Sequence, residues 1–224
     1  MSSDASRPHT RPYRSELRAS QAAQTRLRIL EAAAARFAAV GYTGTSLADV
    51  ADAAGVSVET VKLGGPKRQL LLAAFEHSFA GAEGVDSLAA HGPVAQITAE
   101  ADRERYLAGI VRFVAESNRR SSRLWATLVS AAASDPTLEA ALGALQERRR
   151  SDLLILVDEL ASRGLVPEGS PREQLADAVS FLLSPEGYNQ LVLDAGWPQG
   201  VYEAWLLRSI PLVVAGVPAV EDSV

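Results

Sequence analysis

The sequence predicts an all-α protein of about nine helices, and three observations lead to that class. Hydrophobic residues make up 47% of the 224 residues but aromatic residues only 6%, so the core must consist mostly of alanine, leucine and valine. Alanine and leucine favour helices, whereas a sandwich or barrel needs many β-branched and aromatic residues. Apolar residues also recur at three- and four-residue spacing, without an alternating strand pattern, an internal repeat or a heptad array.

The first eighty residues predict an arm followed by four helices. Residues 1–20 hold arginine, serine, proline and histidine with few apolar residues, so we expect them to be disordered. Glycines at positions 41, 55, 64 and 65 suit helix ends. Thr45 or Ser46, then Ser57, and then Pro66 in a first turn suit helix starts. These signals predict helices over about 21–40, 45–53, 58–63 and 66–79.

Residues 81–97 hold three glycines and a proline and are expected to be a linker to a second helical unit. Thr98 is the expected cap of the next helix. Asp135-Pro136 and Ser170-Pro171 are start signals that each have a glutamate near the capping-box position. The expected helices are 98–118, 121–133, 135–162, 170–183 and 201–214, with Pro211 kinking the last. The chain thus divides into an arm (1–20), a head (21–80) and a body (98–217).

Charge is distributed unevenly along the chain. The net charge is −5, but residues 1–80 carry 10 Lys or Arg against 7 Asp or Glu, and residues 81–224 carry 12 against 20. A basic head on an acidic body suggests that the head meets an anionic partner. Arg7, Arg11, Arg14 and Arg18 of the arm are either a solubilising tail or contacts in a DNA minor groove.

Several classes of protein are excluded or disfavoured. Cysteine is absent, which excludes disulfides, a thiol nucleophile and an iron–sulfur cluster. No two of the three histidines share a helix at metal-ligand spacing, so no metal is expected. No uncharged apolar run is long enough to span a membrane, and the N-terminus does not resemble a secretory signal. No phosphate loop or nucleophile elbow occurs, so we expect neither an enzyme nor a cofactor.

The stretch from Ser46 to Val61 has the spacing of a helix-turn-helix. The motif needs a small residue where its second helix crosses the first, and Ala51 meets that need. Four residues later the tight turn needs a residue that accepts a positive φ, which is Gly55. Ser57 would cap the second helix, whose first side chains then face outward, toward base edges in a major groove. The alternative is a helical hairpin inside a core.

These residues resemble the tetracycline-repressor (TetR) family of bacterial regulators. The resemblance is specific over about residues 26–79 and looser beyond residue 80. It is carried by Ile29-Leu30-Glu31-Ala32-Ala33, Phe37, Gly41-Tyr42, Thr45-Ser46, Val50-Ala51, Ala54-Gly55-Val56-Ser57, Lys67 and Leu70-Leu71. It implies a homodimer with a three-helix DNA-binding head, and a helical body that binds a small effector and releases DNA.

The expected DNA contacts lie in the helix-turn-helix and at the start of the following helix. They are Thr45, Ser46, Ser57, Val58, Glu59, Thr60, Lys62 and Lys67. Thr45 and Ser46 offer a hydroxyl or amide to phosphate, and the resemblance puts Lys67 at the place of a phosphate-contacting lysine. The chain departs from the family at Lys62-Leu63-Gly64-Gly65-Pro66, which is one residue short and lacks an aromatic that normally seats the helix on phosphate. We expect the charge of Lys62 to substitute for that ring.

Two further sets of residues are expected in the body. Large side chains on several helices predict an apolar effector pocket of about 300 Å³ or more; they are Tyr106, Phe113, Trp125, Leu128, Leu153, Phe181 and Tyr188. Apolar stripes on the last two long helices predict the dimer interface; they are Leu175, Val179, Leu182, Trp205, Leu206 and Ile210. The arginine clusters at 119–123 and 148–150 are either solvated or in contact with an anionic effector.

We therefore expect a cytoplasmic homodimeric repressor that binds double-stranded operator DNA at a palindrome. A small-molecule effector of unknown identity would release it. The alternative is a helical dimeric protein that binds a small molecule but has lost operator binding. An operator-binding assay with Lys62 intact and replaced separates the two.

Overall fold

The computed structural model describes residues 11–89 and 91–217. These residues form ten α-helical segments and one π-helical segment, and no strand occurs among them, so the expected all-α class is confirmed. The elements are α1 (Arg11–Val40), α2 (Leu47–Ala54), α3 (Val58–Leu63), α4 (Lys67–Ala80), α5 (Gly92–Thr98), α6 (Arg103–Ala132), α7 (Pro136–Ser162), α8 (Arg172–Leu182), α9 (Pro185–Tyr188), η1 (Asn189–Asp194) and α10 (Gln199–Gly216).

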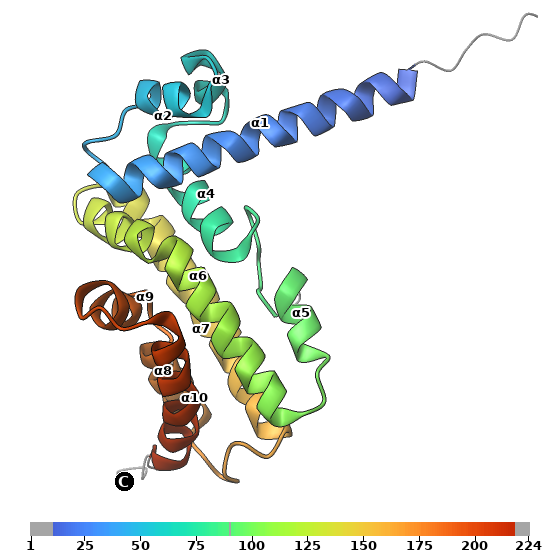
Figure 1. Cartoon of the computed structure of the whole chain (residues 1–224), viewed down its shortest axis with the longest axis vertical. Coiled ribbons are helices and arrows are strands. Elements are labelled where there is room, and N and C mark those ends of the chain that lie inside the picture. Colours follow the sequence, from blue (N-terminus) through green and yellow to red (C-terminus); the bar gives the residue numbers. More distant parts are fainter. Residues whose placement is uncertain (1–10, 90, 218–224) are drawn as a thin grey trace, which may run out of the picture.

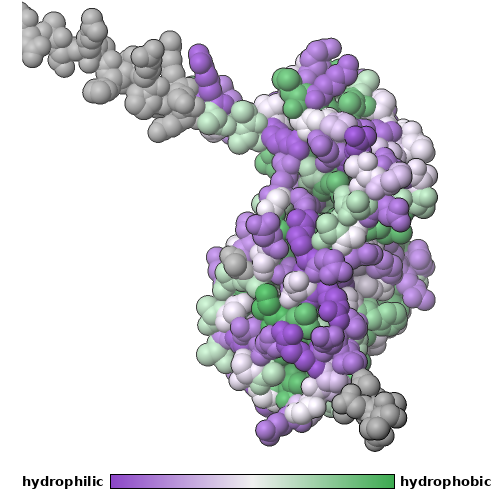
Figure 2. Space-filling model, turned by 180° about the vertical axis from the view of Figure 1, so that it is seen from behind, coloured by the Kyte–Doolittle hydropathy of each residue, from purple (hydrophilic) through white to green (hydrophobic). Residues whose placement is uncertain are grey.

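The helices form a head above an elongated body (Figure 1). α1, α2, α3 and α4 make the head, and α1 projects from it to one side. The long helices α6 and α7 run side by side down the body, flanked by α8 and α10 on one side and by α5 on the other. Figure 2 shows the molecule from behind, with hydrophilic and hydrophobic residues interspersed over the visible face. Among the described residues, no helix has the length and apolar character needed to cross a bilayer.

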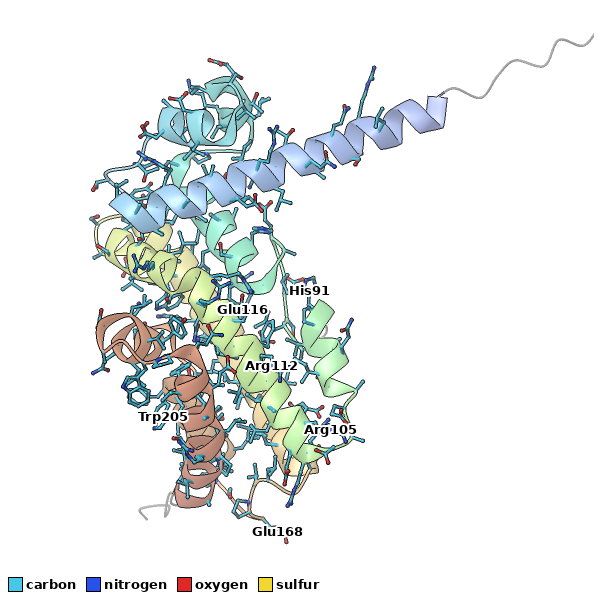
Figure 3. All side chains as sticks on the ribbon, viewed as in Figure 1. His91, Arg105, Arg112, Glu116, Glu168 and Trp205 are labelled. Atoms are coloured by element: carbon cyan, nitrogen blue, oxygen red, sulfur yellow. The ribbon has the colours of Figure 1, made fainter. Side chains whose placement is uncertain are left out.

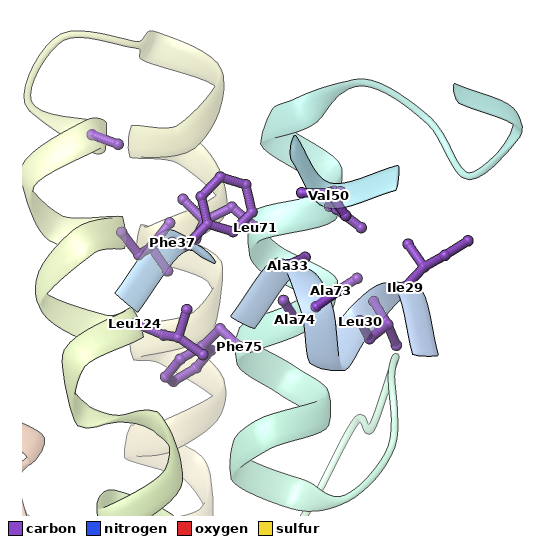
Figure 4. Close-up of a cluster of buried hydrophobic side chains, with 14 of the residues drawn as sticks. Ile29, Leu30, Ala33, Phe37, Val50, Leu71, Ala73, Ala74, Phe75 and Leu124 are labelled. Atoms are coloured by element: carbon purple, nitrogen blue, oxygen red, sulfur yellow. The ribbon is translucent and has the colours of Figure 1, made fainter. Parts of the chain in front are cut away.

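The buried side chains form two clusters. One joins α1, α2 and α4 to the upper part of α6, so that Phe37, Leu71 and Phe75 of the head pack near Leu124 of the body (Figure 4). The other fills the lower body between α6, α7, α8 and α10. Because the first cluster contains residues of both parts, head and body share a core. A movement of α4 or α6 would therefore displace side chains in both the head and the body.

The expected arm boundary was wrong. α1 begins at Arg11 rather than near residue 21, although residues 17–24 are all exposed. Once the buried half of a helix has formed, each added residue gains one backbone hydrogen bond, and the alanines and Leu17 in this stretch favour the helix. The exposed stretch thus needs no tertiary contact to be helical. Residues 1–10 of the predicted arm, with Arg7, lie outside the described residues.

Boundaries in the first half of the body also differ from expectation. The predicted linker contains α5, which starts at Gly92-Pro93. The next helix is capped by Asp102, whose carboxylate accepts from the amides of Glu104 and Arg105, and not by Thr98. It continues without a break through residues 119–120, so α6 is one helix of 30 residues where two were expected. The change from an amphipathic to a uniformly apolar pattern reflects deeper burial, not a helix end.

The second half of the body agrees better. α7 starts and ends as predicted, with Asp135 as its N-cap. The capping box expected at Ser170 does not form, because the Ser170 hydroxyl donates to the carbonyl of Pro167. α9 and η1 were not expected, and α10 runs through Pro211 as one helix.

Candidate functional site

α2 and α3 form a helix-turn-helix with the predicted local chemistry. Ser46 caps α2 in a full capping box, in which its hydroxyl accepts from the Asp49 amide and the Asp49 carboxylate accepts from the Ser46 amide at 2.8 Å. These hydrogen bonds from Ser46 hold the pKa of Asp49 below its ordinary value. Gly55 adopts φ 64°, which a side chain would strain, and Ser57 caps α3 through the Thr60 amide.

α3 has one face toward the core and one toward solvent. Val61 is buried and Val58 is half-buried against the head core, so Val58 does not face fully outward as expected. Glu59 and Lys62 are exposed, and Leu63 is 89% exposed. The Thr60 hydroxyl lies 2.9 Å from that of Ser57. A short helix that presents an acid, a base and an exposed leucine suits contact with base edges and a thymine methyl group.

Three of the expected phosphate contacts have other roles in the structure, and the first is Ser46, whose amide and hydroxyl both donate to the Asp49 carboxylate. Thr45 is 1% exposed and its hydroxyl donates to the carbonyl of Gly41, so it is not available to phosphate. The Lys67 ammonium donates to the carbonyls of Tyr42 and Thr45 at 2.9 and 3.0 Å and lies over the Tyr42 ring. Lys67 therefore fastens the α1–α2 turn to α4. The physical reason is that the turn leaves carbonyls without helix partners, and a cation from α4 satisfies them.

The departure at Gly64-Gly65 has a structural role. A Cβ on Gly64 would lie 2.5 Å from Nη1 of Arg26, so this glycine admits the Arg26 side chain beside the end of α3. Arg26 in turn makes a bidentate ion pair with Glu83, with Nε–Oε1 2.9 Å and Nη2–Oε2 2.5 Å. Glu83 lies in the loop that follows α4. The end of α3 is thereby linked to the connection between head and body, across 57 residues of sequence.

A cavity of about 160 Å³ lies in the body between α4, the loop after it, α5, α6 and α7. Its wall is mostly apolar, with rings from Phe75 and Phe79 of α4 and from Phe113 of α6. Burial, supported by the charge of Glu159, raises the pKa of Tyr106 in this wall to about 12, so the phenol stays neutral. The volume is about half of the minimum expected from the sequence, so a ligand larger than a few heavy atoms must widen it.

Four of the seven predicted effector residues meet at this cavity, namely Tyr106, Phe113, Trp125 and Leu153. The other three do not. Leu128 is fully buried in the upper cluster, and Tyr188 packs edge-to-face on Tyr202 at 5.3 Å. Phe181 is 78% exposed and lines a separate surface groove between α7, α8 and α9. Apolar character alone did not distinguish a wall residue from a core residue or a surface residue.

The comparisons with known proteins agree with this geometry. A family model described as bacterial regulatory proteins, tetR family, matches residues 29–61, from mid-α1 into α3. A protein assigned to that family from Rhodococcus sp. has the same fold, with TM-score 0.64 and 22% identity over 86% of this chain and 100% of its own. No curated protein matches the chain by sequence.

The helix-turn-helix segment therefore matches the TetR family of transcriptional regulators, and the chain has the fold of proteins assigned to that family. Its fold also matches that of the fatty acid degradation regulator FadR from Bacillus halodurans, with TM-score 0.63 and 18% identity over 85% of this chain and 98% of that one. The TetR family regulator PfmR from Thermus thermophilus gives TM-score 0.51 and 24% identity over 86% and 96%. The N-terminal helix-turn-helix thus lies in the segment that the TetR family model matches.

Most of the residues predicted to form the dimer interface lie on the face of α8 and α10 that packs inside the chain. The apolar stripes pack α8 and α10 onto their own body, and these residues are buried: Leu175, Val179, Leu182, Leu206 and Ile210. An apolar stripe on a helix is used first to pack against the core of the same chain, because every copy of the chain must form that core. The side chains of the stripe are then not available to a second copy. Trp205 is partly exposed, packs on Trp197 and Tyr202, and lies on α10 at the edge of the body (Figure 3).

Other residues of α8 and α10 carry exposed apolar surface. Phe181 is 78% exposed, Leu212 73% and Val201 48%. The signal that was available is that each lies off the buried positions of its helix, on another side of the 3.6-residue period.

Proposed function

We propose that this protein is a homodimeric repressor that binds a palindromic operator in the cytoplasm and is released by a small-molecule effector bound in the body. Two heads related by a twofold axis would place two copies of α3 in successive major grooves. Glu59, Thr60 and Leu63 would contact bases, and Lys62 would contact phosphate.

The observation that supports release most directly is that α4 belongs to both sites. Its first residue, Lys67, holds the carbonyls of Tyr42 and Thr45 just before α2. Its second half contributes Phe75, Glu76 and Phe79 to the cavity wall. A ligand that widens the cavity by displacing this wall would therefore move a helix that is fastened to the helix-turn-helix. Because coupling is reciprocal, operator DNA would weaken effector binding by the same factor.

The loop after α4 offers a second connection. Arg148 of α7 pairs with Glu76 at 2.6 Å, and the other oxygen of Glu76 accepts from the Gly84 amide. The neighbouring residue, Glu83, holds Arg26 beside the end of α3. Val85, two residues on, lines the cavity. A change in the cavity wall would thus reach the recognition helix through the loop as well as through α4.

We infer that dimerisation uses the outer faces of α8 and α10, where Phe181 and Leu212 are exposed. Exposed phenylalanine and leucine on two neighbouring helices are typical of an oligomer interface. A symmetric contact would bury both copies of each.

The test is binding of the purified full chain to duplexes from its own upstream region by fluorescence anisotropy, over a series of salt concentrations. Operator binding predicts nanomolar, salt-sensitive affinity that Lys62→Ala weakens on every sequence. The alternative, a dimer that binds a small molecule only, predicts no sequence preference and no loss when Lys62 is replaced.

A further inference from the structure

One arginine differs from the other charged residues around the two body cavities. Arg148 pairs with Glu76, Arg150 with Glu173 and Asp177, and Glu159 with Arg163. The Asp152 carboxylate accepts from the hydroxyl of Ser87 and the amide of Leu88. Among the described residues, Arg149 is the lining arginine that has no carboxylate within ion-pair distance.

Arg149 stands where the two cavities meet. Together with Trp125 and Leu153 it lines both the apolar cavity and the surface groove of about 380 Å³ between α7, α8 and α9. Its Nε and Nη2 donate to the hydroxyl and carbonyl of Ser180, at 3.2 and 2.8 Å. Burial lowers the pKa of its guanidinium, and the charge of Glu186 opposes that shift. The group nevertheless stays protonated at neutral pH.

A half-buried guanidinium with two neutral acceptors has unused capacity. It carries five N–H donors, and only Nε and Nη2 are engaged by the described residues. Glu186, the carboxylate whose charge acts on Arg149, accepts from the Trp125 indole at 2.5 Å. A half-buried charge without an ionic partner is partly desolvated, and a bound anion would offset that cost.

We propose that the effector is an amphiphilic monocarboxylate whose apolar body fills the cavity beside Phe75, Phe113 and Leu156 and whose carboxylate pairs with Arg149. The apolar wall offers nothing to a second charge, because its other ionic groups already have partners. This inference rests on the proposed function only in calling the ligand an effector.

The experiment compares acids with neutral amides of the same shape. Octanoate against octanamide, and 4-phenylbutanoate against 4-phenylbutanamide, are titrated into the full-length protein by calorimetry. A charge-assisted hydrogen bond in a buried site predicts that each acid binds about 10- to 100-fold more tightly than its amide. Without the guanidinium, the desolvation of the carboxylate would favour the amide.

Three variants locate the preference. Arg149→Met removes the charge, and Arg149→Gln removes the charge while keeping a donor for the Ser180 carbonyl. Both should lower the acid-to-amide ratio to about 1 or below, with amide binding retained. Arg150→Gln is the matched control, since Arg150 lines the same groove but is already paired, and it should keep the wild-type ratio. Because the readout is a ratio within one protein, a general loss of stability does not produce it.

Several results would overturn the inference. They are equal affinities for acid and amide in the wild type, no binding of either acid at millimolar concentration, or a full preference in both Arg149 variants. Arg149 variants that weaken the dimer while keeping the preference would assign the partner of Arg149 to a second subunit instead. An acid that binds through Arg149 but leaves operator binding unchanged would support the site and refute release. Release by acid and amide alike would support release and refute the anion site.

Discussion

The exposed ring of Phe181 gives a quantitative prediction about the dimer. Burying a phenylalanine completely stabilises by roughly 1.5 to 3 kcal/mol. Phe181 is 78% exposed in the single chain, and a symmetric interface would bury it twice. Phe181→Ser should therefore weaken the dimer by about 2 to 5 kcal/mol, which is roughly a 30- to 5,000-fold rise in its dissociation constant.

The assay is sedimentation equilibrium of the full chain over a range of micromolar and lower concentrations. Leu63→Ser is the matched control, because Leu63 is 89% exposed but lies on the head. It should leave the dimer unchanged. Leu175→Ala, in the monomer core, should instead lower the melting temperature, by an amount that corresponds to about 2 to 5 kcal/mol.

The reasoning fails if Phe181→Ser leaves the dissociation constant within about twofold of wild type while the chain is dimeric. It also fails if the wild type is a monomer at micromolar concentration. In the first case the interface lies on another face. In the second the proposal of a homodimer is wrong.

Three further predictions concern the head and α6. Lys67→Met should lower the free energy of unfolding in urea by about 1.5 to 3 kcal/mol, because two hydrogen bonds to a charged group are lost. Lys62→Met should leave the free energy of unfolding unchanged and lower the salt slope of DNA binding by about 1. Equal unfolding curves for the two variants would contradict this prediction. Gly64→Ala should destabilise the wild type but be neutral or stabilising in an Arg26→Ala background. If the effects of the two substitutions on the free energy of unfolding simply add in the double variant, the close approach of Arg26 to Gly64 does not limit this position. The pKa of Glu116 is lowered to about 2, first by its hydrogen bond from Arg119 and also by Arg120, so its ion pair contributes stability above its ordinary value of 4.5 that is lost as the pH falls toward 2. Glu116→Gln should flatten the unfolding free energy across that window, and an unaltered acid slope would count against the pair.

Features set by local hydrogen bonds could be predicted from the sequence. Ser46, Ser57 and Asp135 cap the helices expected to follow them, and Gly55 has the positive φ that the turn needs. A cap involves atoms within about three residues, so the sequence contains all the information. The same is true of the helix-turn-helix as a whole.

Features set by partners that are distant in the sequence could not be predicted from it. Lys67 has the residue type of a phosphate contact, but the carbonyls it binds lie 22 and 25 residues away. The partner of Arg26 lies 57 residues away, in the segment expected to be a linker. An apolar stripe shows that one side of a helix is covered but not by which chain, so Leu175, Val179 and Leu206 were assigned to the dimer although they lie in the core of their own chain.

The most direct test of the central claim, that the body cavity controls the head through α4, is operator affinity measured with and without saturating octanoate. Coupling of the usual size predicts that octanoate weakens operator binding about 5- to 150-fold, and that operator DNA weakens octanoate binding by the same factor. Tight octanoate binding with identical operator affinity in both conditions would contradict the claim.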